Sequence, residues 1–186
     1  MKIIGLITTK NRPELFERAL QSAFNQTRKL DRLIVVSDSL PEVKQVERQL
    51  ASKYEAEFIE DIYTHNYAGS LNSALHFILK NDLLSGNDFD GTYIAFLDDD
   101  DIWLSNYLEE CEKSLCGEDF VVSGLIYCNE EGKKYLSIPD DLTVDSFLKG
   151  NPHIQGSNTF IKFSTLLRAG LFDEPIIRKN PPRRGP

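Results

Sequence analysis

The sequence lacks several features that would place the chain in particular protein classes. No apolar run approaches the ~20 residues that span a bilayer, and the run from Met1 reaches Lys10 too early for a secretory signal. Its three cysteines show no metal-ligand spacing, which indicates a reduced, cytoplasmic setting. It also lacks excess positive charge: a formal net charge of −8 excludes a general nucleic-acid partner. Peripheral membrane association and homo-oligomer formation stay open.

What is present fits one soluble globular domain. The 186 residues are 41% hydrophobic and 27% charged, and segments with strand and helix patterns alternate through the first two-thirds. Buried strands are expected at residues 3–7, 33–36 and 93–97, with a shorter strand at 57–61. Helices are expected from Pro13, from Pro41 to about Lys53, and along 71–79 after a loop at 68–70. This alternation predicts a mainly parallel α/β sheet.

The chain after residue 118 has a different pattern. We expect one strand at 120–128, a hairpin through 130–132 to 134–136, a short helix at 143–149 and a strand at 157–163. The sequence therefore divides into an α/β half at 1–118, a smaller mixed portion of the same domain at 119–175, and a flexible tail at 176–186.

Polar residues follow three of the predicted buried strands. Thr8 and Thr9 end the first, Asp38 follows the second, and four consecutive aspartates, 98–101, follow the third. In parallel sheets these ends lie at one edge, where ligands bind. Four carboxylates there repel one another unless a hard cation compensates. The alternatives are a solvated acidic surface for the four aspartates and a helix cap for Asp38.

The segment Phe96–Trp103 resembles the D-x-D-D-x-W motif of family 2 glycosyltransferases, which have the GT-A fold. Residues 35–39 resemble the family's V-V-D-D-G-S element, with Ser37 in place of the first Asp. Further segments agree in the expected order, at residues 8–13, 19–27, 66–72, 155–160 and 170–174. The resemblance covers residues 2 to 175.

The resemblance implies a GT-A type, Rossmann-like mainly parallel sheet flanked by helices, with residues 1–118 binding the nucleotide sugar and 119–175 forming a mixed acceptor-side region. It implies sugar transfer, with inversion and metal assistance, from a nucleotide-sugar donor, UDP-linked, to a glycan, lipid or protein acceptor. It assigns nucleotide binding to Thr8, Thr9, Asn11, Asp38, Asn72 and Asp98. It assigns Mn²⁺ or Mg²⁺ to Asp100 with Asp98, and gives Asp99 and Asp101 a role in orienting the donor sugar or supporting the metal ligands.

The family pattern breaks near the end of the chain. An inverting transferase needs a general base, and no acidic residue follows Glu174 where the family carries one. We therefore expect a truncated chain with no assignable catalytic base and weak or no transfer on its own. The alternatives are a sugar-phosphate nucleotidyltransferase, disfavoured because residues 8–12 contain no glycine, and a non-catalytic nucleotide-binding module.

Overall fold

The computed structural model describes residues 1–84 and 89–173, and its centre is a six-stranded sheet. The strand order is β3-β2-β1-β4-β8-β5. The first four are parallel, and β8 runs antiparallel to both of its neighbours. The strands are β1 (Lys2–Thr9), β2 (Arg32–Ser37), β3 (Glu57–Glu60), β4 (Thr92–Asp98), β5 (Phe120–Val122) and β8 (Thr159–Lys162).

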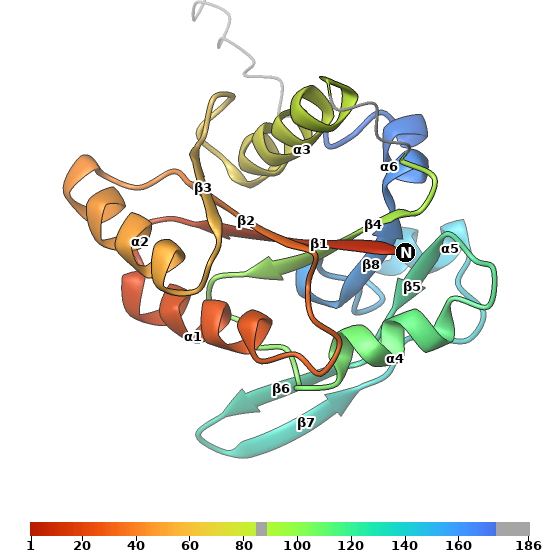
Figure 1. Ribbon diagram of the computed structural model, residues 1–186. Helices are drawn as coiled ribbons and strands as arrows, with labels where there is room; N and C mark the ends of the chain where they lie inside the picture. Colours follow the sequence, from red (N-terminus) through yellow and green to blue (C-terminus); the bar gives the residue numbers. More distant parts are fainter. Residues whose placement is uncertain (85–88, 174–186) are drawn as a thin grey trace, which may run out of the picture.

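Helices cover both faces of this sheet (Figure 1). The helices are α1 (Pro13–Phe24), α2 (Pro41–Lys53), α3 (Tyr67–Leu84), α4 (Tyr107–Ser114), α5 (Val144–Lys149) and α6 (Phe163–Ala169). Ile3 and Ile7 pack in one cluster with α1, α2 and α4, whereas Ile4 and Leu6 pack in a second cluster with α3 and α6. Alternate side chains of one strand thus enter two cores, which explains the continuous apolar runs. The predicted mainly parallel α/β sheet is confirmed.

Two sequence expectations are wrong in detail. Residues 68–70 form the first turn of α3, because the Asn66 side chain accepts a hydrogen bond from Gly69 N (2.9 Å) and caps the helix. The strand expected at 120–128 is split, because Asn158 binds both main-chain groups of Ser123 (3.0 and 2.7 Å). Beyond that break, β6 (Leu125–Asn129) pairs only with β7 (Gly132–Leu136), in a separate sheet.

Helices α4 and α6 have no counterpart in the sequence expectations. Gln26 holds the approach to α4 in place: its side chain donates to Leu104 O (2.7 Å) and accepts from Leu108 N (3.1 Å). Trp103 is 5% exposed and stacks on Tyr107, so it is part of the core. None of the described helices combines the length and the apolar character that a bilayer crossing requires.

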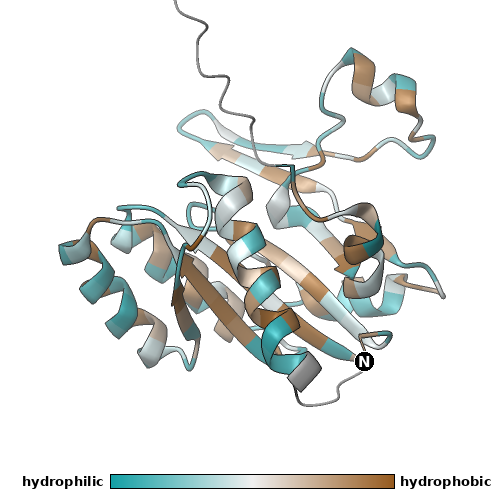
Figure 2. Cartoon of the chain, turned by 90° about the horizontal axis from the view of Figure 1, so that it is seen from above, coloured by the Kyte–Doolittle hydropathy of each residue, from teal (hydrophilic) through white to brown (hydrophobic). Residues whose placement is uncertain are grey.

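Residues 125–150, which include β6, β7 and α5, form what we call the hairpin–helix segment. It contributes no residue to either core cluster, and α5 has no buried residue. Hydropathy colouring shows brown strands in the central sheet beneath helices with teal outer faces (Figure 2). Apolar side chains of the hairpin–helix segment are instead exposed, including Tyr135 (75%), Val144 (78%) and Leu148 (79%).

Candidate nucleotide and metal site

The polar ends of β1, β2 and β4 meet at one edge of the sheet, as expected. Thr8 is paired with Asp98 in the register of β1 with β4, and Asp38 N donates to Thr9 O (3.0 Å). Threonines 8 and 9 therefore separate Asp38 on one side from the aspartate cluster on the other. The strand order thus places two acidic groups at this edge, one on each side of the threonines.

The four aspartates have different surroundings. Asp99 is buried, Asp98 and Asp101 are half-buried, and Asp100 is exposed. Burial, aided by the other three carboxylates, raises the pKa of Asp98, and Tyr67 opposes this only in part. Burial likewise raises the pKa of Asp99, against the hydrogen bonds and positive charge of its neighbours. The four aspartates thus do not form a uniformly solvated acidic surface.

Arg12 places a positive charge beside the aspartate cluster. Its guanidinium contacts both carboxylate oxygens of Asp99 and donates through Nη1 to Asp100 Oδ2 (2.8 Å). Partial burial lowers the pKa of Arg12, but the charges of Asp99 and Asp100 outweigh this and raise it. Arg12 therefore pairs with two of the acids, and Asp99 is held as a structural partner.

A cavity of about 270 Å³ opens beside these groups. It is lined by Thr8, Arg12, Tyr67, Asp98, Asp99 and Asp100. Asp98 Oδ1 is buried and has no hydrogen-bond partner, which is rare for a carboxylate oxygen. An unpaired buried oxygen beside the carboxylate of Asp100 fits a divalent cation, because Mg²⁺ and Mn²⁺ prefer oxygen ligands. Asp98 and Asp100 thus offer oxygen ligands of the kind that such a cation prefers, and their role as its ligands stays a prediction.

Asp38 lies on the other side of the threonines. It accepts hydrogen bonds from Lys10 Nζ (2.6 Å) and pairs with His65 Nδ1 (2.6 Å). Partial burial would raise its pKa, but these two partners lower it, so Asp38 is ionised at neutral pH. It caps no helix, since α2 has no side-chain cap. A carboxylate offers about four acceptor positions, and two remain for a ligand.

Beneath Asp38, a fully buried Glu47 from α2 forms a polar floor. Its carboxylate accepts hydrogen bonds from three hydroxyls: Thr9 (3.2 Å), Ser37 (2.6 Å) and Ser39 (2.7 Å). Ser37 stands where the family pattern has an aspartate, and here it donates to this glutamate. Glu47 thereby joins the ends of β1 and β2.

Asn11 and Asn72 hold neighbouring main chain. The side chain of Asn11 accepts from Leu40 N (2.8 Å), and its backbone has φ of +57°. Asn72 makes two hydrogen bonds to Phe172, with its N (3.1 Å) and O (2.9 Å). Their predicted contact with a nucleotide stays a prediction, as does that of Thr8, which lines the cavity.

Sequence reasoning missed Arg12, Glu47, His65 and Tyr67 at this site. Only Glu47 gave a signal, because it lies four residues before buried Ala51 on the inner face of α2. Arg12, His65 and Tyr67 depend on loop and helix-start geometry that no periodicity encodes. The expectations about Glu174 and the tail lie outside the described residues.

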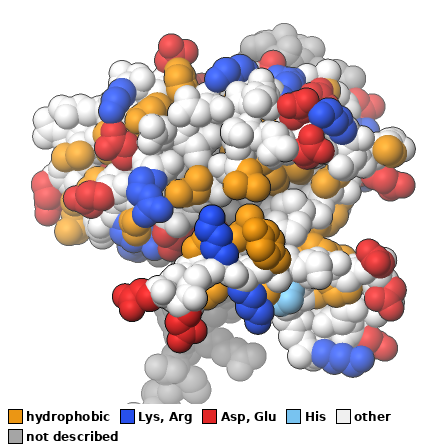
Figure 3. Space-filling view, turned by 90° about the horizontal axis from the view of Figure 1, so that it is seen from below, with side chains coloured by type: hydrophobic (Ala, Val, Ile, Leu, Met, Phe, Trp, Pro, Cys, Tyr) orange, Lys and Arg blue, Asp and Glu red, His pale blue; other side chains and the backbone are white. Residues whose placement is uncertain are grey.

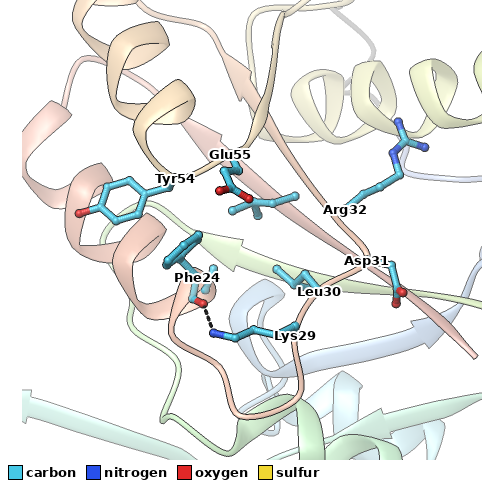
Figure 4. Close-up of a pocket in the computed structure, with 9 residues that line it drawn as sticks. Phe24, Lys29, Leu30, Asp31, Arg32, Tyr54 and Glu55 are labelled. Carbon is cyan, nitrogen blue, oxygen red and sulfur yellow. Dashed lines mark hydrogen bonds between the residues drawn. The ribbon is translucent and has the colours of Figure 1, made fainter.

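A second cavity, of about 320 Å³, lies at the opposite edge of the sheet (Figure 4). It is lined by residues at the end of α1 and the start of β2, among them Phe24, Lys29 and Arg32. Both of its basic side chains have partners: Lys29 donates to Phe24 O (2.8 Å), and Arg32 pairs with Glu57 (2.6 Å). This cavity is remote from the aspartate cluster.

The sheet and its acidic edge define a GT-A type fold, and the chain belongs to glycosyl transferase family 2, whose family model matches residues 6–168. No curated protein matches the chain significantly.

Solved structures share the fold. S. aureus TarS 1–349 in complex with UDP aligns with a TM-score of 0.63 at 15% identity, covering 94% of this chain and 50% of that one. The mannosyltransferase PcManGT from Pyrobaculum calidifontis, in complex with GDP-Man and Mn²⁺, aligns with a TM-score of 0.62 at 18% identity, covering 92% and 47%. The chain thus spans about half the length of these structures.

Proposed function

We propose that this chain binds a nucleotide sugar, UDP-linked, together with Mn²⁺ or Mg²⁺, and forms the donor site of an inverting glycosyltransferase. The unpaired, buried Asp98 Oδ1 beside Asp100 carries the proposal, because it is the group that the free protein leaves unsatisfied. Family membership supports the reaction class. The acceptor, whether glycan, lipid or protein, stays open.

The proposed role of each residue follows from its position at this edge of the sheet. Asp38 would accept a hydrogen bond from the nucleobase, and the backbone at Thr8 and Thr9 would line the base and ribose. Asp98 and Asp100 would hold the cation. Asp101, half-buried beside them, would orient the donor sugar. Such a layout fits the D-x-D motif of the family.

Transfer leaves a nucleoside diphosphate with increased negative charge. The cation, when bound, supplies Lewis-acid stabilisation of that charge, typically several kcal/mol. The residues of this chain would orient the donor and screen its diphosphate from the surrounding carboxylates, with Arg12 neutralising Asp99. No described residue is assigned as the general base, so donor binding without transfer is the expected behaviour of the chain alone.

A reducing, cytoplasmic setting is part of the proposal. Cys111, Cys116 and Cys128 are all free thiols, which supports it. Cys111 is buried, whereas Cys116 and Cys128 are exposed.

Calorimetry tests the site directly. The chain should bind UDP in Mn²⁺ and lose at least about tenfold in affinity in chelator, as expected when a charge-assisted contact is removed. Asp100→Asn should remove most of the metal dependence, whereas Asp140→Asn, an exposed acid in the acceptor-side region, should bind like the wild type. Equal affinity with metal and with chelator would overturn the metal assignment.

The nucleobase assignment has its own experiment. Asp38→Asn should weaken UDP binding while leaving binding of inorganic pyrophosphate with Mn²⁺ unchanged, because Asp38 would contact the base and not the diphosphate. Weakening of both ligands to the same extent would show that Asp38 acts on the fold of the site. Release of pyrophosphate from a nucleoside triphosphate and a sugar phosphate would instead favour a nucleotidyltransferase.

A further inference from the structure

Tyr67, the first residue of α3, places its hydroxyl beside the aspartate cluster. The side chain lines the same cavity as Asp98 and Asp100. The hydroxyl also lies directly over Gly156, the first residue of the 3-10 turn η1 (Gly156–Asn158): a methyl group on Gly156 would lie 2.2 Å from Tyr67 Oη and 3.2 Å from Asp98 Oδ1. Three distant parts of the sequence thus meet at the unpaired carboxylate oxygen.

The turn that carries Gly156 is fixed in place. Ser157 Oγ accepts a hydrogen bond from Asp98 N (3.0 Å), and Ser157 O accepts one from the Trp103 indole (2.9 Å). Ser157 and Asn158 are both buried. The backbone at Gly156 therefore has little freedom to retreat, and the absent side chain is the space that the Tyr67 hydroxyl occupies.

The phenol is a suitable partner for a carboxylate. A tyrosine phenol has an ordinary pKa of about 10, so it keeps its proton throughout the physiological range. A neutral phenol can donate one hydrogen bond. Asp98 Oδ1, which makes no hydrogen bond in this structure, is an acceptor that needs one.

We propose that Tyr67 is a positioning residue for Asp98: in the nucleotide-bound state its hydroxyl donates to one lone pair of Asp98 Oδ1 and leaves the second lone pair of that oxygen facing the cation. Gly156 is also part of this arrangement, because only glycine leaves room for that hydroxyl. The inference rests on the proposed function and adds to it a residue outside the aspartate motif.

Tyr67→Phe tests the role of the hydroxyl while keeping the ring. We expect UDP affinity in Mn²⁺ to fall about tenfold, the effect of losing one hydrogen bond to a charged group, and affinity in chelator to stay unchanged. Tyr63→Phe is the matched control: its hydroxyl is partnered by His76 (3.4 Å), away from the cavity, and it should bind like the wild type. Melting temperatures of both variants verify that they are folded.

Gly156→Ala supplies an independent test through its coupling with Tyr67. Gly156 does not have a left-handed φ, so alanine is opposed only by the contact with the hydroxyl. With Phe at 67, the nearest remaining atoms lie at 3.2 and 3.5 Å. We therefore expect Gly156→Ala to lower metal-dependent UDP affinity about tenfold or more in the wild type, but less than about twofold in the Tyr67→Phe background.

The outcomes separate the two proposals. If the wild type shows no metal-dependent UDP binding, the proposed function fails and takes this inference with it. If the wild type binds and Tyr67→Phe binds equally well, only this inference fails. A loss of the same size in Mn²⁺ and in chelator would also overturn it, since Tyr67 would then act on the nucleotide and not through Asp98.

Discussion

The α/β half of the chain, residues 1–118 (the donor half of the proposed function), and the hairpin–helix segment differ in how they bury apolar side chains. In the donor half, Ile3, Ile7 and Phe16 are each 0% exposed. In the segment, Phe147 is 54% exposed and Leu148 is 79% exposed. The face shown in Figure 3 also displays hydrophobic side chains between charged ones. The hairpin–helix segment therefore contributes little to the free energy of folding, and we expect it to open at low cost.

The largest expected contrast comes from truncating one phenylalanine in each region. Phe16→Ala should lower the free energy of unfolding by about 4 kcal/mol, because it leaves a cavity under the sheet. Phe147→Ala, in α5, should lower it by less than about 0.5 kcal/mol, because the ring is already half in water. Urea denaturation measures both values. Similar losses for the two variants would break the comparison and show that α5 is packed in solution.

The polar floor beneath Asp38 gives the next largest effect. Glu47→Ala leaves three buried hydroxyls without their acceptor and should cost about 3 kcal/mol. Glu47→Gln keeps the shape and one acceptor oxygen, so about 1 kcal/mol is expected. If Glu47→Ala unfolds at the same urea concentration as the wild type, water can replace the carboxylate, and the floor is not a stabilising part of the donor half.

The regions also differ in how far the sequence predicts them. Strands β1, β2 and β4 were predicted because apolar runs covered on both faces leave a clear pattern, and Pro13 and Pro41 mark the first residues of α1 and α2. The edge that joins Thr8, Asp38 and Asp98 followed from the parallel order alone. Topology of this kind is encoded in periodicity.

The features that sequence reasoning missed or predicted wrongly depend on side chains that make contacts across long sequence distances. Asn158 ends β5 from 35 residues away, so no local signal at Ser123 could indicate the break. Arg12 meets Asp99 over a separation of 87 residues. Tyr67 gains its place beside Asp98 from the start of a helix that sequence reasoning set several residues later. Local propensity carries no information on such contacts.

Arg12 tests whether the acidic edge belongs to the stable half. Asp99 is 1% exposed and would lose its ion pair in Arg12→Ala, so unfolding should become easier by about 2 kcal/mol, below the range for fully buried pairs because Arg12 is 45% exposed. Mn²⁺ should restore part of this loss, because a cation on the neighbouring acids screens the unpaired charge. Thermal melts with and without Mn²⁺ measure both effects. A variant as stable as the wild type without metal would place this edge outside the cooperative unit.

The smallest expected effect concerns Asp38 and depends on pH. Partial burial raises its pKa, but Lys10 and His65 lower it further, so the folded-state pKa lies below the unfolded one. The contribution of Asp38 to stability is therefore complete above the ordinary Asp pKa of about 3.9, and it is lost as pH falls through the lower, folded-state pKa. Because Lys10 and His65 are exposed, about 1 kcal/mol or less is expected.

The difference in unfolding free energy between the wild type and Asp38→Asn should therefore be present at neutral pH and shrink below about pH 4. Asp140→Asn, exposed in the acceptor-side region, should give no such difference at any pH. If this difference in unfolding free energy instead widened on acidification, the assigned direction of the pKa shift would be reversed. Asp38 would then not stabilise the donor half.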